Sequence, residues 1–296
     1  MMEGKDFFMG RYKEMCGEEV PSITERKSIR VNTLKIDEAT CVERLRAKGV
    51  VLEKISFTDN GYWISDSKFS LGSTPEYLLG LYYLQEAAAQ VPVRLLAPHP
   101  EDIVLDMCAA PGGKTTQIAQ MMQNKGTIIA TEPNRRRLDS LKYILQRMGV
   151  SNTLVYKKDG RDLSELRMSF DKILLDAPCS GNFISDNEWF NKRDMNGIKR
   201  CAELQEQLIS KAAAILDKDG ILVYSTCSME PEENESIVSH AVNELGLALC
   251  DIDLPLSSPG ITSFQGRDLT GMDKCRRFWP HRSGTQGFFV AKLRKL

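Results

Sequence analysis

Short hydrophobic runs alternate with stretches of helical period along the chain after about residue 92. The runs predict strands at 103–107, 127–131, 153–156, 171–176 and 221–225. The helical stretches predict helices at about 114–123, 136–148 and 199–214. Strands and helices that alternate in this way indicate a parallel sheet with helices on both faces. Two later runs, at about 248–254 and 287–293, are expected to extend one edge of the sheet, the last of them antiparallel.

The chain before residue 92 follows a different pattern. Residues 7–15 have a helical period, and residues 28–34 alternate as a strand does. Asp37 is placed to cap a helix that runs to about residue 48. Two more strands, at about 50–57 and 61–64, complete a small α+β unit. We therefore expect an α+β module at 1–92 and an α/β domain at 93–296.

The composition is that of an ordinary soluble globular protein, with 42% hydrophobic and 27% charged residues among 296. A net charge of −1 gives no overall basic field, so a nucleic-acid partner would have to be held by local patches. The sequence has neither an apolar run long enough to span a membrane nor the apolar core of a signal peptide. A cytoplasmic location is expected.

The cysteines and histidines do not indicate a metal site. None of the eight cysteines forms a C-x-x-C pair, and the three histidines lack metal-ligand spacing. Free thiols in a reducing compartment and no bound metal are the expectation.

Acidic residues and a glycine-rich loop fall at the predicted strand ends, where open α/β sheets bind ligands. The first strand leads into DMCAAPGGK (106–114), whose small residues let backbone N–H groups approach a ligand at a helix N-terminus. The loop lacks the first glycine of an ATP-binding loop, because position 108 is Cys. Glu132, Asp159 and Asp176 end the next strands. One such acid alone is more often a turn or a helix cap, but together they favour an adenosine-type ligand.

Two cysteines follow neighbouring predicted strands, in DAPCSG (176–181) and YSTCS (224–228). A lone cysteine is more often a buried core residue, but two at strand ends indicate thiol chemistry. A thiol that adds to C6 of a pyrimidine makes C5 nucleophilic enough to accept a methyl group. This reaction needs an acid near N3, for which Asp176 is the candidate, and a methyl donor. Lys114 is a candidate for lowering the pKa of a thiol.

The segment FDKILLDAPCSG (170–181) resembles the signature of RNA (cytosine-5) methyltransferases related to Nop2/Sun and to bacterial ribosomal-RNA enzymes. The resemblance extends to residues 30–34, 85–88, 106–114, 225–228 and 284–289. It implies a Rossmann-like S-adenosylmethionine-dependent methyltransferase domain with a mostly parallel seven-stranded sheet. It also implies that the N-terminal module binds RNA.

The same resemblance implies roles for individual residues. Cys227 would attack C6, Cys179 would help to release the covalent adduct, Asp176 would contact the N3 edge and Lys114 would support the site. Glu132 stands where the family commonly has Asp, and its extra methylene should be tolerated. S-adenosylmethionine would be bound by Cys108, Ala109, Ala110, Pro111, Gly112, Gly113, Lys114, Glu132, Arg137, Asp159 and Asp176.

RNA contacts are expected from local basic residues and aromatic rings. The basic candidates are Arg26, Lys27, Arg30, Lys192, Arg193, Lys199, Arg200, Arg276, Arg277 and Arg282. The candidates for stacking on an unpaired base are Phe183, Trp189 and Phe190. In size the chain resembles compact archaeal tRNA methyltransferases, so tRNA is the first expected substrate and rRNA the second. A monomer is expected.

Two other functions remain open. A DNA cytosine-5 methyltransferase would use Cys179 as its nucleophile, but the turn at Cys227 and the N-terminal module argue against it. A non-catalytic RNA-binding factor could keep the fold without turnover. The retention of both cysteines, Asp176 and the glycine-rich loop argues against this alternative.

Overall fold

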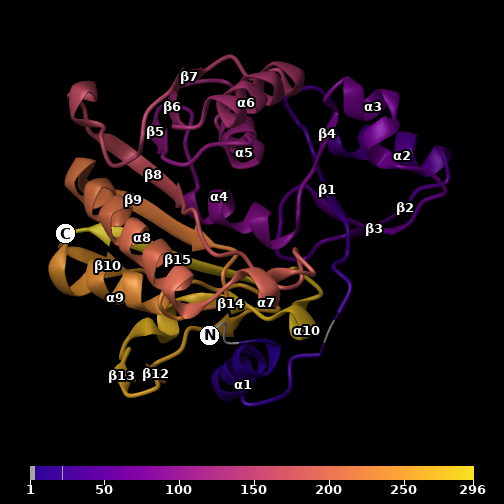
Figure 1. Cartoon of the computed structure of the whole chain (residues 1–296). Helices are drawn as coiled ribbons and strands as arrows, with labels where there is room; N and C mark the ends of the chain where they lie inside the picture. Colours follow the sequence, from indigo (N-terminus) through magenta and orange to yellow (C-terminus); the bar gives the residue numbers. More distant parts are fainter. Residues whose placement is uncertain (1–3, 22) are drawn as a thin grey trace. The chain divides into compact units, whose positions relative to one another are not determined.

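The computed structural model of the chain describes residues 4–21 and 23–296. It consists of two compact units (Figure 1). We call Arg26–Leu174 the central unit, and Met1–Glu25 with Leu175–Leu296 the terminal unit. Among the described residues, no helix is both long and apolar enough to cross a membrane.

The first half of the central unit is a four-stranded antiparallel sheet with one main helix. The strand order is β2-β3-β1-β4. The helix α2 begins after Asp37, whose side chain accepts a hydrogen bond from the Thr40 N–H at 2.9 Å, as the sequence predicted. Its buried face packs on the sheet and forms the core of the module. The bounds are β1 Ser28–Val31, α2 Glu38–Ala47, β2 Val51–Lys54, β3 Gly61–Asp66, α3 Pro75–Leu78 and β4 Tyr82–Leu84.

The second half of the central unit contains parallel strands in the order β8-β5-β6-β7. The predicted alternation of strands and helices is confirmed here, with α5 and α6 beside the strands (Figure 1). The apolar face of α6 packs on β6 and on the loop between β5 and α5. The bounds are α4 Val91–Leu96, β5 Ile103–Asp106, α5 Gly113–Met121, β6 Thr127–Thr131, α6 Arg135–Met148, β7 Thr153–Tyr156 and β8 Phe170–Asp176.

Asn32 joins the two halves of the central unit. Directly after β1, its side-chain amide donates to the backbone oxygens of Gly80 and Met148, each at 2.8 Å. Lys35 adds a hydrogen bond to the backbone oxygen of Arg147 at 2.7 Å. The first half of the central unit therefore holds the last turn of α6 through backbone carbonyls. Because the two halves approach closely here, little space remains around Gly80.

The terminal unit is built on antiparallel strands in the order β11-β14-β15-β9, with β10 also paired to β15. In Figure 1 the helices α8 and α9 run next to each other beside these strands. The bounds are α1 Lys5–Cys16, α7 Trp189–Lys192, α8 Met195–Ile215, β9 Leu216–Thr226, α9 Glu235–Glu244, β10 Leu247–Leu249, β11 Ser258–Pro259, β12 Ser263–Phe264, β13 Arg267–Asp268, β14 Arg276–Phe278, α10 Pro280–Ser283 and β15 Phe288–Lys295.

The strand count of the α/β part differs from the expected seven. Among the described residues, this sheet has nine strands. Four of them, β5 to β8, lie in the central unit, and five, β9, β10, β11, β14 and β15, lie in the terminal unit. The expectation that the runs at 248–254 and 287–293 extend one edge, the last of them antiparallel, is confirmed, because β15 adds to β9 antiparallel and β10 pairs with β15. The strands β14 and β11 extend this edge further. The very short β11 and β14 have no sequence period of their own, so only their pairing partners identify them.

We expect Gly80→Ala to destabilise the protein more than Gly49→Ala. Both glycines have positive φ, 71° and 84°, which costs an alanine about 1 kcal/mol. At Gly80 an added Cβ would also lie 2.1 Å from the backbone oxygen of Arg147, whereas at Gly49 it would meet nothing within 4 Å. We expect losses of about 3 and about 1 kcal/mol, measured by urea unfolding. Equal losses would contradict close packing between the module and α6.

Candidate active site

Two thiols lie side by side at strand ends of the terminal unit. Cys179 follows the last residue of β8 by three positions, and Cys227 directly follows β9. Their Sγ atoms are 3.2 Å apart, and both side chains are half-buried. A backbone hydrogen bond joins the two chain segments just before the cysteines, where Ala177 N–H donates to the Ser225 oxygen at 2.9 Å. The structure thus brings together the two cysteines that the sequence singled out.

The pKa of the Cys179 thiol is raised well above its ordinary value. The hydrogen bond with Cys227 is the largest cause, followed by burial and by the charges of Cys227 and Glu233. A raised pKa keeps this group protonated around neutral pH. Once one thiol of the pair has ionised, the proton on the other is held more tightly, so the pair is suited to one thiolate beside one protonated thiol.

Asp176 is the last residue of β8, and its carboxylate is oriented by β9. Its Oδ1 accepts a hydrogen bond from the Ser225 hydroxyl at 2.8 Å, and Ser225 lies two residues before Cys227. The side chain is half-buried. The predicted acid and the predicted nucleophile therefore stand on neighbouring turns of one unit.

Four residues that the sequence analysis missed tie these turns together. The buried carboxylate of Glu233 accepts hydrogen bonds from Ser180, from Ser228 and from Gln205 on α8. Each serine directly follows one of the two cysteines. The repeated Cys-Ser pair, and the acidic run at 230–235 just after Cys227, are the signals that could have led to these residues.

The loop expected to hold the cofactor lies in the central unit. Ala109 N–H donates to the Thr131 oxygen at 3.0 Å, which fixes the loop against β6. Thr115 on α5 donates to Asp106 Oδ2 at 2.7 Å, which fixes the start of α5 against the end of β5. Gly112 caps α5 with φ 112°, a value that favours glycine. The N-terminus of α5 is thus held next to the strand ends.

Arg137 joins two of the predicted cofactor residues. Its guanidinium lies 3.2 Å from Glu132 Oε2 and donates to the Ala110 oxygen at 2.8 Å. The other carboxylate oxygen of Glu132 accepts from Asn134 N–H at 2.8 Å. Asp159 is less enclosed. It pairs with Arg161 at 2.7 Å, and hydrogen bonding from that side chain lowers the pKa of its carboxyl group.

The polar groups of the central unit fit an S-adenosylmethionine cofactor. The ribose hydroxyls of the cofactor need a hydrogen-bond acceptor. The buried Glu132 carboxylate has about four lone-pair positions, of which Asn134 and Arg137 use two. Its carboxylate and sulfonium ends suit a helix N-terminus and an acid-lined edge. Lys114, the second residue of α5, is half-buried at this loop. The role of each residue toward the cofactor remains a prediction.

The expectation that Arg30 contacts RNA was wrong, because its side chain is buried and only 1% exposed. It donates to the Gly113 oxygen at 2.8 Å and to Thr116 Oγ1 at 2.7 Å, and it also hydrogen-bonds Gln85. Burial lowers the pKa of its guanidinium to about 9, so it stays charged at neutral pH. Arg30 supports the start of α5 instead.

Arg277, another RNA-contact candidate, is also buried. It is 3% exposed and forms an ion pair with the buried Glu235. The other eight basic candidates are exposed or half-buried, as a binding surface requires.

The aromatic residues expected to stack on a base are mostly part of the protein core. Trp189 is 1% exposed and packs against Phe8 of α1. Phe183 is 8% exposed and packs against Tyr12 of α1. Phe190 is half-buried in the same cluster. Their burial is explained by the packing of α1 against them, and the position of α1 could not be known from the sequence.

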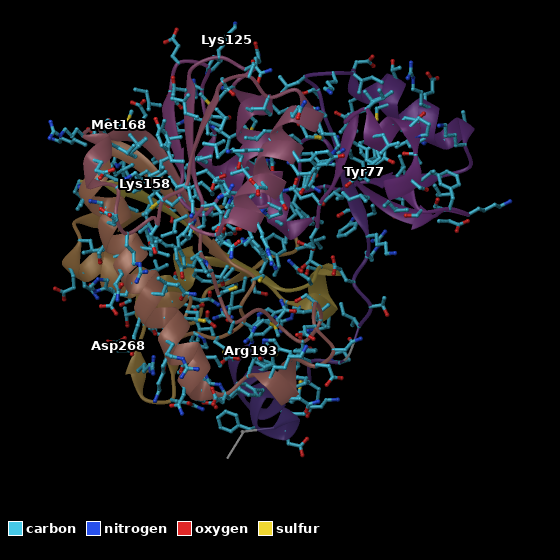
Figure 2. The ribbon with its side chains drawn as sticks, turned by 45° about the horizontal axis from the view of Figure 1, so that its top comes forward. Tyr77, Lys125, Lys158, Met168, Arg193 and Asp268 are labelled. Carbon is cyan, nitrogen blue, oxygen red and sulfur yellow. The ribbon has the colours of Figure 1, made fainter. Side chains whose placement is uncertain are left out.

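The aromatic cluster supports the Cys179 turn. Trp189 Nε1 donates to the backbone oxygen of Ser180 at 2.9 Å. Arg193, which is labelled in Figure 2, donates from Nε to the same oxygen at 2.9 Å. Two side chains that the sequence assigned to RNA contacts therefore hold the residue next to Cys179.

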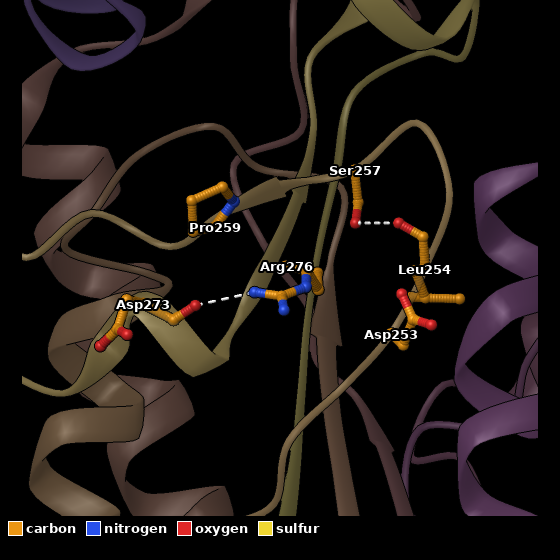
Figure 3. A pocket seen from close by; sticks show the side chains of 6 residues that line it. All are labelled: Asp253, Leu254, Ser257, Pro259, Asp273 and Arg276. Atoms are coloured by element: carbon orange, nitrogen blue, oxygen red, sulfur yellow. Dashed lines mark hydrogen bonds between the residues drawn. The ribbon is translucent and has the colours of Figure 1, made fainter.

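The terminal unit also contains an open pocket of about 480 Å³ (Figure 3). None of the predicted catalytic or cofactor-binding residues lines it. Of the basic residues predicted to contact RNA, Arg276 lines it. The pocket is lined by Asp253, Leu254, Ser257, Pro259, Asp273 and Arg276. A search of residues 4–21 and 23–296 finds no group of three metal-ligating His, Cys, Asp or Glu side chains.

Known protein families match almost the whole chain. Residues 93–294 match the family described as 16S rRNA methyltransferase RsmB/F. Residues 6–87 match the N-terminal domain of 16S rRNA methyltransferase RsmF.

Two solved structures have the same fold. A methyltransferase homologue from Pyrococcus horikoshii is 39% identical with a TM-score of 0.90, over 99% of this chain and 95% of that one. NSun6 from the same organism, solved with SFG, is 28% identical with a TM-score of 0.86, over 97% of both chains.

The fold is therefore the Rossmann-like α/β fold of S-adenosylmethionine-dependent methyltransferases, preceded by an α+β module. Within that class, the chain belongs to the RsmB/F family of RNA (cytosine-5) methyltransferases. The family resemblance drawn from the sequence is thereby confirmed.

Relatives in the family act on different RNAs. A mouse 28S rRNA (cytosine-C(5))-methyltransferase is 40% identical over 90% of this chain and 35% of its own length. A tRNA (cytosine(72)-C(5))-methyltransferase of Pyrococcus horikoshii is 40% identical over 77% of this chain and 57% of its own. Ribosomal RNA small subunit methyltransferase F of Shewanella loihica is 38% identical over 92% and 57%. The chain thus spans about a third to three fifths of these relatives.

We expect Cys227→Ala to make Cys179 more reactive toward iodoacetamide. The variant removes the hydrogen bond that raises the pKa of Cys179 most, so more thiolate forms at a given pH. The measurement is the alkylation rate of the Cys179 peptide at pH 8 by mass spectrometry. Cys250→Ala, which removes another half-buried thiol of the terminal unit, is the control. An unchanged rate in Cys227→Ala would contradict the coupling of the two thiols.

Proposed function

We propose that the protein is an S-adenosylmethionine-dependent RNA (cytosine-5) methyltransferase that works through a covalent adduct. The observation that carries the proposal is the 3.2 Å contact between the Cys179 and Cys227 thiols, with Asp176 on the neighbouring turn. Membership of the RsmB/F family supports the same reaction.

Cys227 is the nucleophile in this proposal. Its thiolate forms a bond to C6 of the cytosine, while the carboxyl group of Asp176 donates a proton to N3 and so neutralises the negative charge that develops on that edge of the ring. The bound S-adenosylmethionine supplies an electrophilic methyl group for C5. The C5 proton is then lost to a base, and the bond between Cys227 and C6 breaks. In this release step the proton of Cys179 passes to the departing sulfur of Cys227, 3.2 Å away, a role that the raised pKa of Cys179 supports.

Most of the proposed cofactor residues lie in the central unit, and Asp176 lies in the terminal unit. The segment 108–114, Glu132, Arg137 and Asp159 would bind the cofactor, and Lys114 and Asp176 would serve both cofactor and substrate. The fit of the loop and of the Glu132 carboxylate to an adenosine ligand supports the assignment.

The substrate is proposed to be tRNA first and rRNA second. The similarity to a tRNA (cytosine(72)-C(5))-methyltransferase supports tRNA, and the names of the mouse and Shewanella relatives support rRNA. Residues 1–92 are proposed as the RNA-binding module and 93–296 as the catalytic domain, a boundary that the family matches at 6–87 and 93–294 support. The monomeric state and cytoplasmic location remain predictions.

We expect the two cysteines to give opposite results in a methylation assay. Unmodified tRNA is incubated with labelled S-adenosylmethionine, and each reaction is also run on a denaturing gel. Cys227→Ala abolishes methylation and forms no adduct, because no thiol attacks C6. Cys179→Ala accumulates a denaturant-stable protein–RNA band, because release is blocked.

Parallel reactions with rRNA and with duplex DNA separate the alternatives, and Cys250→Ala serves as the matched control. An adduct in Cys227→Ala and none in Cys179→Ala would reverse the thiol roles and overturn the assignment. If the wild type methylates DNA but no RNA, the substrate class is wrong. Methylation of rRNA alone would move the assignment to the second substrate.

A further inference from the structure

A single buried carboxylate connects the two cysteine turns. Glu233 is fully buried, in the segment that follows the Cys227 turn. Its Oε2 accepts from Ser180 N–H at 2.9 Å and from Gln205 Nε2 at 2.8 Å. Its Oε1 accepts from the Ser228 hydroxyl at 2.8 Å and also from the Ser180 hydroxyl. One side chain therefore contacts the residue after each thiol.

Further hydrogen bonds fix the position of Glu233 itself. Tyr224 on β9 donates from its hydroxyl to the Glu233 backbone oxygen at 2.5 Å. The next residue, Asn234, donates to the Ser228 oxygen at 2.9 Å and accepts from the Thr226 hydroxyl at 2.6 Å. Gln205 uses the same amide nitrogen to bind the Pro178 oxygen at 2.9 Å. The carboxylate is thus anchored to β9, to α8 and to both turns.

We propose that Glu233 is a positioning residue, whose carboxylate holds the Cys179 and Cys227 turns at the spacing that keeps the two thiols in contact. The proposal rests on the proposed function, in which one thiol attacks and the other assists release. Neither turn is a helix or strand at its cysteine, so the regular hydrogen bonds of the sheet end before the thiols. Small errors in the placement of reacting groups cost about 100-fold in rate, which makes such a support consequential.

The turns are also linked directly. At their start Ala177 N–H donates to the Ser225 oxygen at 2.9 Å. Beyond the cysteines, Asn182 donates to the Cys227 oxygen at 2.7 Å, and the two serine hydroxyls are 3.3 Å apart. Removing the Glu233 carboxylate would leave the Ser180 N–H, two hydroxyls and an amide without their buried acceptor. The turns would then separate or reorganise, and the thiol contact would be lost.

The test compares Glu233→Ala and Glu233→Gln with the wild type in two assays. One measures kcat and KM for RNA and S-adenosylmethionine. The other measures binding of phenylarsine oxide, which bridges two thiols held close together and needs neither RNA nor cofactor. We expect Glu233→Ala to lower kcat about 100-fold with both KM values within about threefold, and to weaken arsenical binding at least tenfold.

Glu233→Gln should restore most of both signals. Its amide oxygen can accept from Ser180 N–H and Gln205, and the two serine hydroxyls can rotate to accept from its NH₂ group. The matched control is Glu232→Ala, because Glu232 is a buried carboxylate in the same segment that pairs with Arg11 instead of the turns. It should retain wild-type arsenical binding.

If Glu233→Ala does not fold, the double variant Ser180→Ala/Ser228→Ala decides, with an expected loss of about tenfold in both assays. Wild-type kcat and arsenical binding in a folded Glu233→Ala or in the serine double variant would overturn the proposal. So would an equal loss of arsenical binding in Glu232→Ala. Failure of the wild type to methylate RNA would count against the proposed function alone, because the arsenical assay still measures the thiol spacing.

Discussion

The terminal unit depends on satisfying a run of buried carboxylates. Four of the six residues at 230–235 are glutamates, and all four are buried. A buried carboxylate is costly unless hydrogen-bond donors or cations surround it, so each one requires partners from distant parts of the chain. Glu230 binds Arg11 and Tyr12 of α1, and Glu235 binds Arg277 of β14. One short segment thereby fixes the N-terminal helix, a strand and the two cysteine turns.

Burial also changes the chemistry of these groups. It raises the pKa of Glu230 to about 7, against the lowering effect of Arg11, and it contributes to the raised pKa of Cys179. In the central unit the buried Arg30 shows the converse case, a cation that donates to a carbonyl and to neutral side-chain oxygens at the start of α5. In both units, charged side chains that look like surface residues in the sequence serve as internal supports.

The sequence predicted the elements that have a strong period and the residues that stand at their ends. The strands β6 and β7 agree with prediction residue for residue. Both cysteines and Asp176 were singled out because strand ends are where such folds bind ligands, and their roles remain predictions. Burial was predicted less well. Arg30, Arg277 and Trp189 each look like RNA-contact residues until their partners are known, and those partners come from segments far away in the chain. The contacts of Glu233 were missed for the same reason, since a carboxylate that joins two turns has no local signature.

The saturated hydrogen bonding of Ser180 has a consequence for protein engineering. Its N–H and hydroxyl bind Glu233, and its carbonyl accepts from both Trp189 and Arg193. A loop transplanted from another protein to carry Cys179 would have to reproduce all of these contacts at once. The practical unit of exchange is therefore a set of segments, 176–193 together with 224–235 and position 205, and not the cysteine loop by itself. Evolution within such a scaffold is expected to proceed by correlated changes across these segments.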